Sequence, residues 1–116
     1  MGSRSMDNVK NNSYYIRKIV TDVSFVLEHT ADLTQSELEQ NEVLFDCVMF
    51  RLIQVSENSA RLTADFRTRY HSIPWQAIKG LRNRIVHDYG EVEKSIIYDT
   101  IKDDLPVLLA ELQGLE

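Results

Sequence analysis

The residues whose types and spacing could support chemistry lie close together in the segment 81–90. It holds Arg82, Asn83, His87 and Tyr89. A histidine with a pKa near neutrality can take a proton from a ribose 2′-hydroxyl or give one to a leaving oxygen. A guanidinium can pair with the negative charge that develops on phosphorus. Together, and without a set of metal ligands beside them, these residue types suit chemistry on a phosphodiester.

Helical geometry decides which of these side chains can meet. Asn83 and His87 are four residues apart and share one face, whereas Arg82 lies about 140° from His87 on an ideal helix. The arginine stem could curl round the helix, the helix could loosen before Gly90, or a second copy of the helix could supply its own Arg82. The last arrangement predicts a symmetric dimer with a composite cleft. The spacing also fits a structural interpretation, with His87 at a helix C-terminus and Arg82 in an ion pair.

The distribution of charge matters more than its total. A net charge of −5 disfavours nucleic-acid binding, because phosphate is bound mainly by lysine and arginine. Six basic residues nevertheless lie between 61 and 87 against the single acid Asp65: Arg61, Arg67, Arg69, Lys79, Arg82 and Arg84. This run is either a solvated helix face or the footprint of a nucleic-acid site. Tyr14, Tyr15, Tyr70 and Trp75 could likewise stack on bases or simply pack.

Helical periodicity runs along most of the chain, and no segment shows the sustained alternation of a strand. The main helices are expected over 9–27, 41–56, 74–88 and 93–112, with a shorter one ending near Phe66 and a polar turn at 57–59. Thr34 and Glu37 form a capping-box pattern that opens a short helix. The pattern predicts an all-α fold, an up-and-down bundle of four main helices plus one short helix.

Individual residues refine these expectations. Pro74 suits the first turn of a helix, whereas Pro106 should kink the last one, and Gly90 could end the helix that carries His87. In the central helix apolar residues go almost all the way round, as in a helix buried at the centre of a bundle or between subunits, so Cys47 should be inert core.

Length and composition bound the class of protein. The 116 residues allow one compact domain, expected over 6–116, because residues 1–5 ahead of Met6 look like a cloning remnant. A single cysteine and no zinc-like spacing predict neither a disulfide framework nor a metal site, and favour a reducing, cytoplasmic setting. The sequence has no apolar run long enough for a membrane span and no export signal.

Arg82, Asn83, His87 and Tyr89 together resemble the Arg-x4-His-x-Tyr motif of HEPN-domain proteins, and specifically of the HepT-like toxins of HepT/MntA toxin-antitoxin pairs. The resemblance extends from Asp7 over nearly the whole chain. Three further segments are similar to the family at corresponding places: Phe66-Arg67-x-Arg69, Ile73-Pro74-Trp75-x-x-Ile78 and Asp103-Asp104-Leu105-Pro106. One segment departs from it. Family members commonly show an Ile-Gly-Glu-Ala-like step in the central helix, whereas this chain reads Ile53-Gln54-Val55-Ser56-Glu57-Asn58, with Glu57 as a shifted counterpart.

The resemblance implies a homodimeric, metal-independent endoribonuclease without a cofactor, the toxin of a type VII-like pair. Arg82 and His87 would be the catalytic pair and Asn83 would help to position them. Attack by the substrate's own 2′-hydroxyl would leave a 2′,3′-cyclic phosphate and a 5′-hydroxyl on RNA, with tRNA and mRNA as candidate substrates. An MntA-like nucleotidyltransferase antitoxin would transfer AMP to Tyr89, where the anionic adduct would block the cleft and repel RNA.

Two other hypotheses remain open. Some HEPN domains are non-catalytic partners or regulatory subunits of a nucleotidyltransferase, and the chain could also be an acidic helical interaction protein of unrelated function. The intact pair of Arg82 and His87 favours catalysis, because a docking partner needs neither residue.

Overall fold

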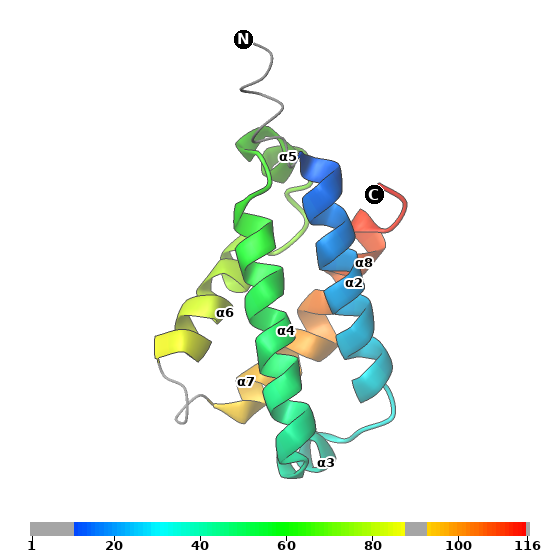
Figure 1. Ribbon diagram of the computed structural model, residues 1–116, viewed down its shortest axis with the longest axis vertical. Helices are drawn as coiled ribbons and strands as arrows, with labels where there is room; N and C mark the ends of the chain where they lie inside the picture. The colour runs from blue at the N-terminus through cyan, green and yellow to red at the C-terminus, as the bar shows by residue number, and fades with distance from the viewer. Residues whose placement is uncertain (1–10, 88–92, 116) are drawn as a thin grey trace.

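The computed structural model describes residues 11–87 and 93–115, and every regular element in these two ranges is helical (Figure 1). In chain order the elements are α2 (Asn12–Thr30), α3 (Gln35–Gln40), α4 (Glu42–Ala60), α5 (Ala64–Arg69), α6 (Trp75–His87), α7 (Lys94–Asp99), the π-helical η1 (Thr100–Asp104) and α8 (Leu105–Leu112). The all-α prediction is confirmed. α7, η1 and α8 follow one another without a break and are together called the last rod.

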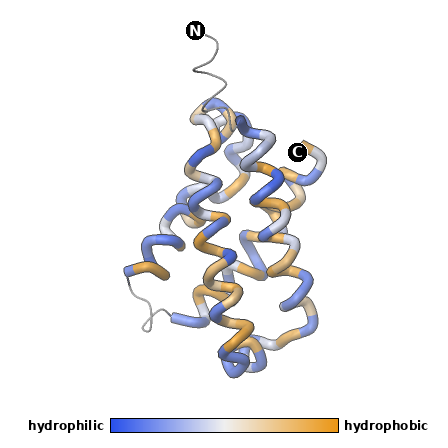
Figure 2. Tube along the Cα trace, viewed as in Figure 1, coloured by the Kyte–Doolittle hydropathy of each residue, from blue (hydrophilic) through white to orange (hydrophobic). Residues whose placement is uncertain are grey.

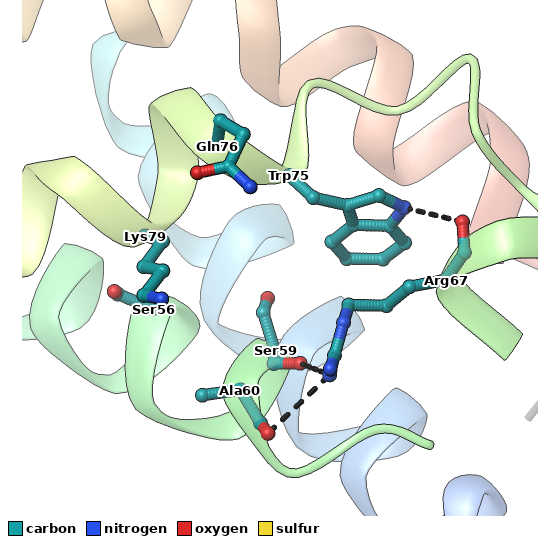
Figure 3. A pocket seen from close by; sticks show the side chains of 7 residues that line it. All are labelled: Ser56, Ser59, Ala60, Arg67, Trp75, Gln76 and Lys79. Carbon is teal, nitrogen blue, oxygen red and sulfur yellow. Dashed lines mark hydrogen bonds between the residues drawn. The ribbon is translucent and has the colours of Figure 1, made fainter. Parts of the chain in front are cut away.

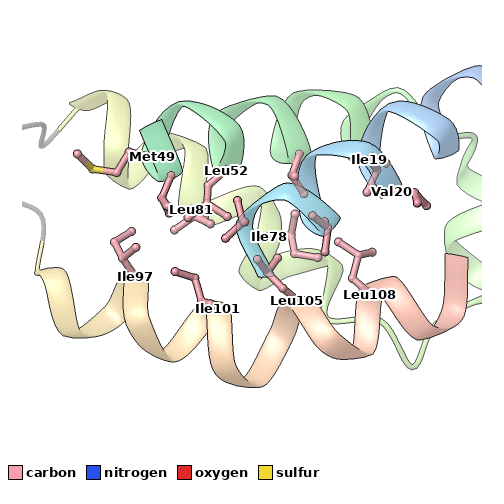
Figure 4. Packing of buried hydrophobic residues seen from close by; sticks show 14 of the residues in the cluster. Ile19, Val20, Met49, Leu52, Ile78, Leu81, Ile97, Ile101, Leu105 and Leu108 are labelled. Atoms are coloured by element: carbon pink, nitrogen blue, oxygen red, sulfur yellow. The ribbon is translucent and has the colours of Figure 1, made fainter. Parts of the chain in front are cut away.

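The long elements α2, α4, α6 and the last rod run alternately up and down, and α4 lies between α2 and α6 (Figure 1). Side chains from all four meet in one core (Figure 4). Those labelled there are Ile19, Val20, Met49, Leu52, Ile78, Leu81, Ile97, Ile101, Leu105 and Leu108. Within the described ranges α3 follows the capping box and α5 includes Phe66, where the local patterns placed short helices, although the bundle as a whole was expected to hold only one short helix. The core fixes α6 against α4, and this contact positions the candidate site.

The capping box at Thr34 is confirmed. The Thr34 hydroxyl accepts a hydrogen bond from the Glu37 backbone N–H at 3.1 Å, and the Thr34 N–H donates to the Glu37 carboxylate at 2.9 Å. These reciprocal bonds satisfy two backbone donors that the start of a helix otherwise leaves unpaired. They begin α3 directly after Thr34, which is where the local sequence pattern put it.

The predicted polar turn at 57–59 is wrong, because α4 continues through it to Ala60. Asn58 and Ser59 are buried there. The Asn58 amide donates to the Gln54 carbonyl at 2.9 Å, so the helix itself supplies a partner for this polar side chain. Packing against neighbouring helices outweighs the local preference of these residues for a turn. The extra helical turn brings Glu57 beside α6.

Within the single chain α4 is not buried all round, which contradicts a place at the centre of one bundle, while the alternative of a helix between subunits stays a prediction. Val43 is 82% exposed and Phe50 58% exposed, and Cys47 is only half-buried. Figure 2 shows the hydrophobic colouring of the half of α4 near α3. Because α2, α3 and α6 cover α4 from the other sides, its remaining face stays uncovered in the single chain.

The last helix does depart from regular α geometry before Pro106. The Leu105 N–H donates to the Thr100 carbonyl, five residues back, so the backbone widens into the π-helical η1. Proline has no N–H to donate and its ring crowds the carbonyl four residues earlier. The widened turn accommodates Pro106 in the first turn of α8.

None of the helices within the described residues has the length and apolar character that crossing a membrane would require.

Candidate active site

α6 carries the candidate catalytic residues and is fixed by its apolar stripe. It begins directly after Pro74, and Ile78, Leu81 and Ile85 are buried against the rest of the bundle. Asn83 and His87 are exposed, while Arg82 is partly buried at the edge of the stripe. The helix therefore presents Asn83 and His87 outward, as their four-residue spacing predicts, and it turns Arg82 toward α4.

A carboxylate of α4 holds Arg82. Its Nε donates to Glu57 Oε2 at 2.9 Å, and its Nη1 donates to Asn83 Oδ1 at 3.3 Å. The side chains of the ion pair are 37% and 43% exposed, so water screens much of the attraction. Even so, two bonds at different nitrogens restrict the plane of the guanidinium. Glu57 and Asn83 thus orient Arg82.

The interpretation of Arg82 as an ion-pair member is confirmed. The sequence alone did not reveal its partner, although Glu57 stood out as the shifted counterpart of a family position. The signal was weak because the two residues are 25 positions apart. The Arg82–Glu57 bond requires α4 to continue past Ser56. The incorrect prediction of a turn at 57–59 therefore hid this pairing.

The structure does not bring Arg82 and His87 together within one chain. The Arg82 guanidinium turns to Glu57, so its stem does not curl round α6 toward His87. His87 is the last described residue of α6, and it is exposed. Asp88, Tyr89 and Gly90 lie outside the described residues, and with them the expected modification site and helix end. A second copy supplying its own Arg82 stays a prediction.

A groove beside Glu57 combines aromatic and cationic side chains. Its volume is about 300 Å³, and it is lined by Tyr14, Tyr15, Lys18, Gln54, Glu57, Asn58 and Arg61. The Tyr14 and Tyr15 rings meet edge to face with centroids 5.1 Å apart, and Lys18 Nζ lies 5.9 Å from the Tyr14 centroid. Aromatic faces with nearby cations suit single-stranded nucleic acid. The tyrosine pair was visible in the sequence, but its position next to Glu57 was not.

The other side of α6 is acidic. A cavity of about 310 Å³ there is lined by Asp99, Asp103 and Asp104 of the last rod, with Arg84 of α6 among its other lining residues. Burial, together with the charge of Asp103, raises the pKa of Asp104. These carboxylates offset Arg84 and would repel phosphate. The basic run 61–87 is therefore not one uniform surface, and its α4-facing side is the one suited to an anion.

Among residues 11–87 and 93–115, no three histidine, cysteine, aspartate or glutamate side chains are grouped so that they could hold a metal ion.

Comparison with known proteins agrees with this site. The family model described as "Ribonuclease HepT-like" matches residues 19–115. "Putative RNase MJ1380" of Methanocaldococcus jannaschii is 26% identical over 99 residues, covering 85% of this chain and 91% of the relative. "Putative RNase TTE0752" of Caldanaerobacter subterraneus subsp. tengcongensis is 27% identical over 101 residues, covering 87% and 90%.

A third relative carries the family name itself. "Probable ribonuclease HepT" of Thermococcus cleftensis is 22% identical over 106 residues, covering 91% of this chain and 96% of the relative. No solved structure gave a significant match. The family match spans most of the chain and includes α6 with Arg82, Asn83 and His87, so the chain belongs to the ribonuclease HepT-like family of HEPN proteins.

Proposed function

We propose that the protein is a metal-independent endoribonuclease, the toxin of a type VII-like toxin-antitoxin pair. The observation that carries the proposal is the Arg82 guanidinium, held by Glu57 and Asn83 little more than one helical turn before the exposed His87. In a HepT-like chain this arrangement offers a fixed positive charge and a proton-transfer group on one helix.

The proposed reaction uses the RNA itself as the nucleophile. A base takes the proton of a ribose 2′-hydroxyl, the 2′-oxygen forms a bond to the adjacent phosphorus, and the bond to the 5′-oxygen breaks. An acid protonates that leaving oxygen, so the products are a 2′,3′-cyclic phosphate and a 5′-hydroxyl. His87 is assigned to proton transfer and Arg82 to the charge that develops on phosphorus. Because one chain brings only one such histidine, a second copy of the motif would provide the second proton-transfer group.

An uncovered stripe on α4 supports a homodimer. Val43, Cys47, Phe50, Gln54 and Glu57 lie within about 80° of one another around an ideal helix. The stripe is apolar at Val43 and Phe50, and it ends at the carboxylate that holds Arg82. A second copy packed on this stripe would bury apolar surface and bring its α6 toward Arg82, which is the composite cleft that one of the arrangements of Arg82 and His87 predicts.

The dimer gives a direct prediction for Phe50→Glu. Since Phe50 is largely exposed, the substitution should leave the melting temperature of the single chain within a few degrees of the wild type. Burying a charge at the interface should weaken association by at least about tenfold. Analytical ultracentrifugation over a range of concentrations checks this. Glu28→Lys on the exposed side of α2 is the control and should dimerise normally. Unchanged association of Phe50→Glu would place the interface elsewhere.

A second prediction concerns Glu57→Gln. Loss of a half-exposed ion pair should change the free energy of unfolding by less than about 1 kcal/mol. Cleavage should fall by about tenfold, because Arg82 is no longer held in one orientation. Thermal denaturation and initial cleavage rates measure the two effects. Glu28→Gln removes the same charge from α2 and should retain full activity. Full activity of Glu57→Gln would show that Arg82 needs no partner on α4.

In the proposed toxin-antitoxin pair, Tyr89 is the residue that the antitoxin modifies. An MntA-like nucleotidyltransferase would form a phosphodiester between AMP and the Tyr89 hydroxyl, releasing pyrophosphate from ATP. The negative adduct, two residues after His87, would repel RNA phosphate. Incubation with such an enzyme and ATP should add one AMP by intact mass and stop cleavage. Tyr89→Phe should take up no AMP and stay active in its presence.

The experiment that tests the function is incubation of the purified protein with total tRNA and with mRNA in the presence of EDTA, followed by analysis of the end groups. Cleavage that leaves cyclic phosphate ends supports the proposal. No cleavage by protein whose Tyr89 is unmodified by intact mass would favour the alternative, a non-catalytic HEPN partner of a nucleotidyltransferase.

A further inference from the structure

A cavity of about 210 Å³ lies where α4, α5 and α6 meet (Figure 3). It is lined by Ser56, Ser59, Ala60, Arg67, Trp75, Gln76 and Lys79. Arginine, lysine, two serine hydroxyls and a glutamine amide supply its polar groups, and none of the seven residues carries a carboxylate. Its lining therefore has a net positive charge and is rich in hydrogen-bond donors, which suits an anion.

Backbone carbonyls hold the Arg67 side chain in place on one side of this cavity. Its Nη1 donates to the carbonyls of Ser59 at 3.2 Å and Ala60 at 3.3 Å, and also to the carbonyl of Leu62. These contacts offset the partial negative charge at the C-terminus of α4. They account for Arg67 as a helix cap, but they leave the positive charge of Lys79 without a structural explanation.

Ser59 adds a second, independent observation. It is 4% exposed, and its hydroxyl is a buried side-chain polar atom with no hydrogen-bond partner. In Figure 3 this hydroxyl points toward the Trp75 ring and into the cavity. Buried hydroxyls are nearly always paired, so an unpaired one facing a cationic cavity indicates a ligand that accepts its hydrogen bond.

The first turn of α6 forms another wall of the cavity. Trp75 and Gln76 begin this thirteen-residue helix and line the cavity. The backbone N–H groups of Trp75 and Ile78 already donate to the carbonyls of Ile73 and Pro74, so the first turn contributes mainly through the helix dipole, which favours an anion there. The Trp75 indole is held by bonds from its Nε1 to the carbonyls of Arg67 and Tyr70, both at 3.1 Å. The cavity wall is thus built before any ligand arrives.

We propose that this cavity binds a phosphate group of the RNA strand, beside the phosphate that is cleaved. The inference rests on the proposed function, since it takes RNA as the ligand. Lys79 precedes Arg82, the residue assigned to the reacting phosphorus, by three residues, or about 4.5 Å along α6. That distance matches one to two nucleotides of a stacked strand, at about 3.4 Å of rise each. Ser56 directly precedes Glu57, so the cavity adjoins the Arg82 ion pair from α4 as well.

The volume of the cavity limits the size of the ligand that it can hold. Sites that enclose drug-sized molecules usually measure roughly 300 to 1,000 Å³. At about 210 Å³, this cavity has room for a phosphate and part of a ribose, which suits a backbone contact better than a whole nucleotide. A contact of this kind adds affinity and register without reading the base sequence.

Trp75 makes the proposal directly testable, because it is the only tryptophan of the chain and it lines the cavity. The background is His87→Ala, so that RNA stays intact. The Trp75 fluorescence of this variant is followed during titration with single-stranded oligouridylate and, separately, with inorganic phosphate. We expect a saturable change with RNA. Lys79→Gln should weaken RNA binding by about three- to tenfold and lower the slope of log affinity against log salt by about 0.7.

Two further variants separate ligand binding from fold. Ser59→Ala should weaken RNA binding while leaving the melting temperature equal or higher, because an unpaired buried hydroxyl is removed. A serine with a purely structural role would lower the melting temperature instead. Lys102→Gln in the last rod removes the same charge from a residue that does not line the cavity, and it should leave both affinity and salt slope unchanged.

Three results would overturn the inference. These are equal salt slopes for Lys79→Gln and Lys102→Gln, RNA affinity that is unaffected by Ser59→Ala, and a fluorescence response to inorganic phosphate without any to RNA, which would identify a site for free phosphate. Failure of the ribonuclease proposal looks different. In that case RNA binding depends on Lys79 as expected, but protein with an intact His87 does not cleave the bound strand.

Discussion

His87→Ala is expected to lower the rate of metal-free RNA cleavage by about 10²- to 10⁴-fold, the usual contribution of a positioned general acid or base. His87 is exposed at the end of the described part of α6, and the core lies on the other side of that helix. Its loss should therefore leave the fold and the stability nearly unchanged. Initial rates in EDTA and a thermal melt followed by circular dichroism measure the two effects.

His71→Ala is the matched control for this experiment. His71 is also exposed, but it lies in the turn between α5 and α6. Its replacement should leave cleavage at the wild-type rate. Cleavage that persists in His87→Ala would remove His87 from the mechanism, and equal losses in both variants would indicate a general effect of histidine substitution.

Ile85→Ala is expected to have the largest effect on stability, a loss of about 2 to 5 kcal/mol in the free energy of unfolding. Ile85 is 0% exposed and lies between Arg82 and His87 on the buried side of α6. Truncating it removes apolar burial and leaves a cavity where α6 meets the core. A domain is typically stable by only about 5 to 15 kcal/mol, so this loss should be obvious in urea unfolding.

Val86→Ala is the neighbouring control. Val86 is exposed, so its truncation should change the free energy of unfolding by less than about 0.5 kcal/mol. If Ile85→Ala cost no more than Val86→Ala, the packing of α6 would differ from the one described. Ile85→Ala should also reduce cleavage at temperatures below unfolding, since a loosened α6 no longer holds Arg82 against Glu57.

Local patterns were sufficient for much of the fold. Helical spacing of apolar residues identified the long helices, because burial of one face needs only the sequence period. The capping box at Thr34 was confirmed for the same reason, since its bonds join residues three positions apart. The side of α6 that is exposed also followed from spacing, and it put Asn83 and His87 outward.

Long-range packing governed the rest. α4 extends through a polar stretch because α2 and α6 flank it, and this extension places Glu57 against Arg82 across 25 residues of sequence. Apolar residues on α4 stayed uncovered at Val43 and Phe50, although their spacing resembled that of a buried helix. Periodicity predicts which residues share a face of a helix, but it does not predict which faces other helices will cover.

The cavity between α4, α5 and α6 shows most clearly which features the sequence reveals and which depend on packing. Arg67, Trp75 and Lys79 were visible in the sequence as parts of a basic, aromatic run, and their chemistry was evident from their types. Ser59 was assigned to a turn and carried no signal at all. The convergence of these residues on one 210 Å³ cavity depends on how three helices meet. Side-chain chemistry and helical period are properties of the chain, whereas the ligand-sized space between helices exists only once they have packed.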